Sequence, residues 1–155
     1  LDQLIAYLRA TLQASRAESH SLRAEFERLR DYLALMQVRM GSRLQVQLDL
    51  PEELAELPLP PLLLQPLVEN AIKHGLEPAL EGGLLRVSAR RQGQTLSLRV
   101  EDSGVGLGAA PVSDGTGFGL DQVRERLRTR FGASAQFRLQ ALQPHGTLAE
   151  LEIPL

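Results

Sequence analysis

Four polar side chains of different chemistry occur within six residues of the sequence, at Glu69, Asn70, Lys73 and His74. On a helix, at about 100° per residue, they fall within an arc of roughly 140°, and apolar residues occupy the rest of the circumference. An amide oxygen is a hard ligand that suits Mg²⁺, and an ammonium group suits a phosphate. The cluster indicates a metal and phosphate site. The alternative is a solvated helix face on which Glu69 and Lys73 form an ion pair.

The composition marks two of these positions as unusual. Lys73 is the only lysine among 17 basic residues, and Asn70 is the only asparagine of the chain. Either this is chance within a biased composition, or both positions require that particular side chain. We favour the second interpretation because the two exceptions stand three residues apart in one motif.

A second candidate is Asp102, which ends an alternating strand pattern just before Gly104 and Gly106. A carboxylate at a strand end can point into a crevice and accept a hydrogen bond from an exocyclic amine. Glycines beside it allow a flat ring to approach the backbone. The alternative is a simple turn, because Asp-Ser-Gly is also favourable turn chemistry.

A third candidate is the segment GTGFG, from Gly115 to Gly119, which leads directly into a predicted helix. Glycines free the backbone amides to face an anion, and the N-terminus of a helix adds a positive dipole end. The pattern is neither a Walker loop nor a dinucleotide-binding fingerprint, because it lacks their lysine and their preceding strand. A flexible loop before a helix is the alternative.

The elements that position these groups follow from the hydrophobic pattern. Residues 1–40 predict two amphipathic helices, and the second, from Leu22 to Met40, has apolar residues at a spacing of about 3.5. Ser21 suits the N-terminal cap of that helix and Gly41 its end. The pattern fits equally a core-facing helix pair and a stem that forms a dimer.

Alternating residues predict a strand at 44–50 and two hairpins, at 85–101 and at 136–153. A Pro-rich connection leads to a helix that starts near Pro60-Pro61 and runs to His74, with Gly75 as its terminator and Pro66 limiting its first turn. A further helix is predicted at 120–131. Helices combined with antiparallel hairpins predict an α+β fold, a sheet with helices on one face.

The overall composition excludes several classes of protein. A chain of 155 residues is long enough for one domain with a core of its own. The absence of cysteine excludes disulfides and thiolate metal sites. A net charge of −2 predicts neither nucleic acid nor an anionic membrane surface as a partner.

The three candidates occur in an order that resembles the ATP-binding domain shared by histidine kinases, gyrase-type topoisomerases, Hsp90 and mismatch-repair ATPases, the GHKL superfamily. LVENAIKHG (67–75) resembles the N box, EDSGVGL (101–107) the first glycine box and GTGFGL (115–120) the second. GTLAELEIP (146–154) resembles the closing strand of that fold. More narrowly, DYLALMQVRMGSRL and LPPLLLQPLVENAIKHG resemble the LytS-like sensor histidine kinases.

This resemblance implies a two-layer Bergerat-type sandwich, in which a mixed sheet carries three helices on one face. It further implies two parts of the chain. Residues 1–42 resemble the remaining helices of a dimerisation and phosphotransfer stem, and residues 43–155 resemble the ATP-binding catalytic domain.

The roles implied by the resemblance are assigned residue by residue. Asn70 matches the Mg²⁺ ligand, Lys73 and His74 match positions that face the phosphates, and Asp102 matches the acid that reads the adenine amino group. Gly104 and Gly106 match the glycines beside the base, and Thr147 matches a threonine that supports the adenine site through water. The lid over the phosphates matches Gly115, Thr116, Gly117, Gly119 and Leu120, with a short connection at 108–114.

Catalysis is expected from Glu69, Asn70 and Lys73. Related families place an assisting polar residue four positions before the asparagine, where this chain has Pro66, and Glu69 is the candidate substitute. The phosphate-accepting histidine of the LytS-like family lies in a His-Phe-Leu-Phe-Asn stretch that this chain lacks. His20 stands in a context that does not match it, so a surface position is expected for His20.

The implied function is to bind ATP and Mg²⁺ and to donate the γ-phosphate to a stem histidine of the same protein or its dimer mate. A response regulator would then take the phosphate. The resemblance also implies a homodimer anchored in the membrane, with this domain on the cytoplasmic side. The alternatives are a non-catalytic nucleotide-binding module and an ATPase of the gyrase or Hsp90 kind, which the short lid disfavours.

Overall fold

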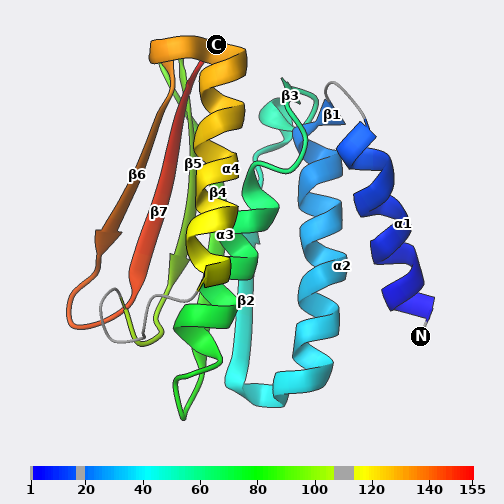
Figure 1. Ribbon diagram of the computed structural model, residues 1–155, viewed down its shortest axis with the longest axis vertical. Coiled ribbons are helices and arrows are strands. Elements are labelled where there is room, and N and C mark those ends of the chain that lie inside the picture. The colour runs from blue at the N-terminus through cyan, green and yellow to red at the C-terminus, as the bar shows by residue number, and fades with distance from the viewer. Residues whose placement is uncertain (1, 17–19, 107–113) are drawn as a thin grey trace.

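One mixed sheet of five strands forms the centre of the computed structural model, which describes residues 2–16, 20–106 and 114–155 (Figure 1). The strand order is β2–β4–β5–β7–β6; β2 and β4 are parallel, and the other neighbours are antiparallel. The bounds are β2 Leu44–Asp49, β4 Gly83–Gln92, β5 Thr95–Asp102, β6 Gln136–Ala141 and β7 Thr147–Pro154. The predicted mixed sheet and both predicted hairpins are confirmed.

The first hairpin shows why the alternating pattern was informative. Leu85 and Val87 of β4 are buried, as are Leu98 and Val100 of β5, and each residue is paired across the ladder with a partner of the same face. Gly93 has a φ of 60° in the turn between the strands. The polar residues between the buried ones form the opposite face of the sheet.

Three helices cover one face of this sheet (Figure 1). They are α2 Leu22–Met40, α3 Leu64–Asn70 and α4 Asp114–Phe131. Their apolar side chains join those of the sheet in a single buried cluster, which confirms the predicted two-layer arrangement. Helix α1 Asp2–Arg16 lies outermost and packs against α2.

Helix α2 begins and ends at the predicted residues. The amide of Ala24 donates to the Oγ of Ser21 over 3.1 Å, and Gly41 has a φ of 63° at the C-terminus. The apolar residues of its 3.5-residue pattern are buried in the cluster shared with the sheet, among them Phe26, Leu29 and Leu33. In this structure that face of α2 is therefore a core face. The predicted boundary between residues 42 and 43 falls inside this shared core and stays a prediction.

Three predicted helix boundaries are wrong. The helix that carries Asn70 does not end at His74: α3 continues as a π-helix, η3 Ala71–Leu76, in which the amide of Glu77 donates to the carbonyl of Ile72 over 2.8 Å. Its start is Leu64 rather than Pro60-Pro61, so Pro66 lies in its first turn. The last helix starts at Asp114 rather than Leu120, so Gly115 to Gly119 lie in helical turns and not in a loop.

Short elements complete the chain. Strands β1 His20–Ser21 and β3 Pro58–Leu59 pair antiparallel, and three 3₁₀ turns lie at η1 Gly41–Arg43, η2 Glu52–Leu54 and η4 Gly132–Ser134. Within the described residues, no helix has the length and apolar character needed to cross a membrane.

Candidate functional site

Asp102 is a buried carboxylate at the end of β5, with only 4% of its surface exposed. The amide of Gly104 donates to its Oδ1 over 2.9 Å. Burial raises the pKa of Asp102 to about 6, and the Gly104 hydrogen bond opposes part of that rise. The group is therefore still mostly ionised at pH 7. An ionised carboxylate in such a place can accept a hydrogen bond from an incoming N–H group.

Glycines hold the backbone close around this carboxylate. A Cβ atom on Gly75 would lie 2.6 Å from Oδ1 of Asp102, and one on Gly104 would lie 2.0 Å from the carbonyl oxygen of Gly75. The amide of Val105 donates to that same carbonyl over 2.9 Å. The sequence prediction treated Gly75 only as a helix terminator. The structure gives a further reason for a glycine at this position, because any side chain here would collide with Asp102.

The closing hairpin brings the predicted residues of β7 to the same place. Thr147 is paired directly with Asp102 across the β5–β7 ladder. Gly146 has a φ of 110°, and a Cβ atom there would lie 2.2 Å from the carbonyl oxygen of Asp102. Gly106 has a φ of 86° and approaches the backbone of Gly146. The structure therefore brings Asp102, Gly104, Gly106 and Thr147 together.

Asn70 ends helix α3 with a buried side-chain oxygen. Its Oδ1 is buried and has no hydrogen-bond partner. Leaving such an atom unpaired costs about 1–3 kcal/mol, so an unpaired buried amide oxygen requires an explanation. A ligand supplied from outside the chain, such as a hydrated cation, would satisfy it.

Asn70 stands where the α-helix turns into the π-helix η3. Single π turns are rare and occur frequently at functional sites. Lys73 in this turn is exposed, which leaves its ammonium group free to move toward an anion. His74 is half-buried; burial lowers its pKa, and Lys73 lowers it further. His74 is therefore mostly neutral at pH 7 and contributes a hydrogen-bonding ring rather than a charge.

The predicted lid is described only in part. Gly115, Thr116, Gly117 and Gly119 lie in the first turns of α4, and Leu120 is buried in the core. The connection predicted at 108–114 lies outside the described residues except for Asp114. Because these glycines lie inside α4 and not in a loop before it, only the first amides of the helix remain free to face an anion, together with the positive dipole end.

Glu69 faces a different environment from the one predicted. Its Oε2 accepts hydrogen bonds from the hydroxyl of Tyr7 over 3.1 Å and from the amide nitrogen of Gln65 over 2.8 Å. Tyr7 belongs to α1, so the first helix reaches the residue next to Asn70. Sequence reasoning missed both partners. Nothing in a local pattern links Tyr7 to Glu69, 62 positions away, whereas the spacing of four between Gln65 and Glu69 on one helix was a signal that could have been used.

A buried charge cluster fixes the start of α3. Glu25, with 1% of its surface exposed, forms ion pairs with Arg28 over 2.6 Å and with His20 over 2.7 Å. Its other oxygen accepts the amide of Leu64 over 2.9 Å. Burial alone would raise the pKa of Glu25, but the contacts with His20, Arg28 and Leu64 together lower it. His20 is thus not the surface residue predicted, because this cluster holds it.

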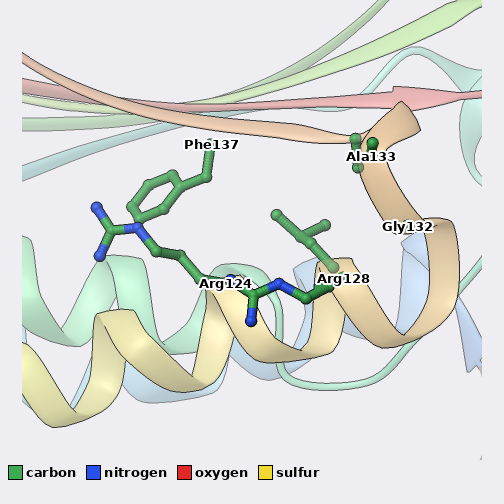
Figure 2. A pocket seen from close by; sticks show the side chains of 7 residues that line it. Arg124, Arg128, Gly132, Ala133 and Phe137 are labelled. Atoms are coloured by element: carbon green, nitrogen blue, oxygen red, sulfur yellow. The ribbon is translucent and has the colours of Figure 1, made fainter.

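A separate hollow of about 390 Å³ lies between α4 and β6, near the C-terminal end of α4 (Figure 2). Arg124 and Arg128 of α4 line it, and the guanidinium of Arg124 lies 4.7 Å from the centroid of the Phe137 ring. No predicted site residue that the structure describes is among its lining residues. The predicted chemistry lies at the opposite end of α4, where Gly115 begins the helix.

The residues present fit a magnesium–nucleotide ligand. Mg²⁺ is usually held by one or two protein oxygens, with waters and substrate phosphates completing the shell. The unpaired Oδ1 of Asn70 is an oxygen of that kind. Within the described residues no group of three or more His, Asp or Glu side chains gathers to hold a metal. A cation here would therefore depend on phosphate oxygens that the nucleotide brings.

Comparison with known protein families gives two matches. Residues 60–155 match the family described as histidine kinase-, DNA gyrase B- and HSP90-like ATPase, and residues 1–44 match the family described as histidine kinase. The first match covers more than half of the chain and includes Asn70, Asp102 and Thr147.

Individual relatives agree with the family match. The chain is 43% identical to the sensor histidine kinase BtsS of Escherichia coli K12 over 84% of its length, and 33% identical to the sensor protein LytS of Enterococcus faecalis over 100%. It covers 24% and 28% of those proteins, about a quarter of their length. The histidine kinase domain of a blue-light activated kinase from Erythrobacter litoralis superposes with a TM-score of 0.64 at 19% identity, covering 99% of this chain and 74% of that one. At that identity the last comparison shows the fold.

Proposed function

Because the chain belongs to the family of histidine kinase-, DNA gyrase B- and HSP90-like ATPases, we propose that it binds Mg·ATP at Asn70 and Asp102 as the catalytic domain of a sensor histidine kinase. The observation that carries this proposal is the buried carboxylate of Asp102. It stands at a strand end, and the glycines around it let the backbone pack closely against it. A carboxylate kept in that position destabilises the folded chain, so a ligand that uses it explains its presence.

Asp102 and its neighbours recognise the base. The carboxylate accepts the exocyclic amino group of adenine, and Thr147 on the paired strand supports it through water. Gly104 and Gly106 allow the ring to lie against the backbone. A base without an amino group in that position would leave the buried carboxylate unpaired, which disfavours its binding.

The phosphates lie along η3 and the start of α4. Asn70 holds the cation through Oδ1, and the bound Mg²⁺ supplies charge neutralisation between phosphate oxygens. Lys73 adds an ammonium group, and His74 adds a neutral ring nitrogen. The lid over the phosphates would be formed by Gly115, Thr116, Gly117, Gly119 and Leu120, where the first amides of α4 and its positive dipole end face the phosphates.

The reaction is phosphoryl transfer to a histidine of an upstream stem, in the same protein or its dimer mate. Positioning and charge neutralisation are most of what such a transfer requires of a protein. Asn70 and Lys73 fulfil these roles, and Glu69 orients the groups beside them. A response regulator receives the phosphate in turn, and the whole protein is a membrane-anchored homodimer with this domain on the cytoplasmic side.

One observation favours a second candidate function, a nucleotide-binding module without phosphotransfer. Pro66 occupies the position from which relatives supply an assisting polar residue, and Glu69 is held by Tyr7 and Gln65. Phosphotransfer to an added stem segment that contains an acceptor histidine would separate the two candidates.

Calorimetric titration with a non-hydrolysable ATP analogue and Mg²⁺ tests the binding site. We expect saturable binding of one nucleotide per chain, and binding weaker by about tenfold or more for Asp102→Asn, since the amide of the variant no longer offers a charged acceptor. Arg124→Ala, at the far end of α4, is the control and should bind as the wild type does. Equal affinity of the wild type and Asp102→Asn would refute the role of Asp102. A folded wild type without binding would refute the proposed site.

A further inference from the structure

Among the described side chains of α1, Tyr7 is the one that is buried against the rest of the chain. Tyr7 is 8% exposed, whereas Leu4, Ile5, Leu8 and Leu12 of the same helix are 44–59% exposed. Its ring lies 5.5 Å from that of Tyr32 on α2. The packing of α1 against the rest of the chain therefore depends strongly on the contacts that Tyr7 makes.

The hydroxyl of Tyr7 enters a hydrogen-bonded cluster on α3. It donates to Oε2 of Glu69 over 3.1 Å and accepts from the side-chain nitrogen of Gln65. Gln65 is itself buried and donates to the same carboxylate oxygen over 2.8 Å. Each of the three groups thus contacts the other two, and the arrangement leaves little freedom to the Glu69 side chain.

The surroundings of Tyr32 link α2 to the same place. Burial raises the pKa of the Tyr32 hydroxyl above its ordinary value, and the nearby carboxylate of Glu69 raises it further. The backbone neighbour of Glu69 is Asn70, the last residue of α3 before the π turn.

We propose that Tyr7 is a positioning residue of the nucleotide site, which couples the docking of α1 to nucleotide binding through Glu69 and the end of α3. This inference rests on the proposed function. With Tyr7 in place, Glu69 is fixed on the side of α1, and the turn that carries Asn70 is fixed with it. When α1 leaves, Glu69 loses one of its two donors and the turn at Asn70 gains freedom.

Coupling of this kind is reciprocal. If the docking of α1 favours nucleotide binding, bound nucleotide must favour the docking of α1 by the same factor. Since α1 is the first helix of the chain, movement of any segment that precedes it would reach the nucleotide site through this contact. Among the described side chains of α1, the contact with Glu69 is made by Tyr7, so one substitution tests it.

A double-mutant cycle on nucleotide affinity tests the proposal in the whole chain. Tyr7→Phe keeps the ring against Tyr32 and removes only the hydroxyl, and we expect it to weaken binding of the Mg²⁺–ATP analogue about fivefold, at the low end of typical coupling between sites. In a Glu69→Ala background the same substitution should have no further effect, since the acceptor is already absent. Leu8→Ala, on the exposed face of α1, is the matched control and should bind as the wild type does.

Amide hydrogen exchange of α1 provides a second test. If Tyr7 only packed α1 against α2, nucleotide would not change the rate of this exchange. Saturating nucleotide should slow amide exchange in α1 of the wild type and have no effect on it in Tyr7→Phe. Unchanged affinity of Tyr7→Phe, or the same loss from Tyr7→Phe in both backgrounds, would overturn the proposal while leaving the binding site intact. Absence of nucleotide binding by the wild type would overturn the site and this inference together.

Discussion

The carboxylate of Asp102 is buried, and burial changes how tightly it holds its proton. Its pKa is raised from 3.8 to about 6, so the folded chain binds this proton more tightly than the unfolded chain does. The stability from that difference is fully present below about pH 4 and is lost as the pH rises through 6. Near pH 7 the ionised, buried carboxylate therefore lowers the free energy of unfolding.

We expect Asp102→Asn to stabilise the nucleotide-free chain at pH 7 by up to about 2–3 kcal/mol, because an amide carries no charge to bury and still accepts the hydrogen bond of Gly104. Urea unfolding of both proteins at pH 7 and at pH 4 measures the difference, which should disappear at the lower pH. A variant that is less stable at pH 7 would show that the carboxylate has another partner. The same substitution weakens nucleotide binding, so stability and function should change in opposite directions.

Asn70 gives a prediction about the metal. Replacing it by alanine removes a buried oxygen that has no partner, so the fold should lose little or no stability. The same change removes the protein ligand of the cation. We expect Mg²⁺ to strengthen binding of the ATP analogue in the wild type and to have almost no effect in Asn70→Ala, measured by titration with and without Mg²⁺. A variant that keeps the full Mg²⁺ effect would show that the cation is held elsewhere.

At the scale of elements, the site depends on the close approach of η3 to the end of β5. A Cβ atom on Gly104 would lie 2.0 Å from the carbonyl oxygen of Gly75. That oxygen belongs to the backbone, which cannot move aside as the end of a flexible side chain can. We expect Gly104→Ala to lower the free energy of unfolding by about 3 kcal/mol or more, by overpacking. Denaturant unfolding gives the value.

Gly41 provides the matched control for that substitution. It has a φ of 63°, but a Cβ atom there would meet nothing within 4 Å. Gly41→Ala should therefore cost only about 1 kcal/mol, from the backbone conformation alone. Gly104 has no such φ, so equal losses for the two variants would mean that its contact with η3 adds little.

The elements that sequence predicted best were those fixed by local chemistry. The β4–β5 hairpin follows from alternation around Gln92-Gly93, and the start of α2 follows from the cap at Ser21. The predicted end of the helix that carries Asn70 was wrong because a tertiary contact decides it. Gly75 is typical of a helix end, but here the helix passes through it as a π turn, which keeps Gly75 against Asp102.

For the whole molecule, the order of the motifs carried the resemblance to the family that residues 60–155 match, whereas no single motif was specific. Asn70, Asp102 and Thr147 come from α3, β5 and β7, and the ladder places Thr147 opposite Asp102. The contacts of Glu69 and of Glu25 could not be predicted, since each joins segments far apart in sequence through one or two side chains. Such contacts leave no periodic signal in a single sequence.

The two N-terminal helices differ in what they bury, and this leads to a prediction about which part of the chain folds alone. Helix α2 contributes Leu22, Phe26, Leu29 and Leu33 to the shared core, and its Glu25 accepts the first amides of α3. Helix α1 buries chiefly Tyr7 among its described side chains. Removing α1 should therefore expose little apolar surface, whereas removing α2 would uncover one side of the core.

We expect a chain that starts at His20 to unfold cooperatively with most of the stability of the whole chain, and a chain that starts at Arg43 to lack a cooperative transition, as followed by circular dichroism during urea titration. The physical reason is that each buried leucine or phenylalanine of α2 contributes about 1.5–3 kcal/mol, and their sum approaches the 5–15 kcal/mol by which domains are usually stable. Cooperative unfolding of residues 43–155 alone would instead support the boundary predicted from sequence, with α2 belonging to the stem. In that case the apolar face of α2 would be available to other partners once it leaves the sheet domain.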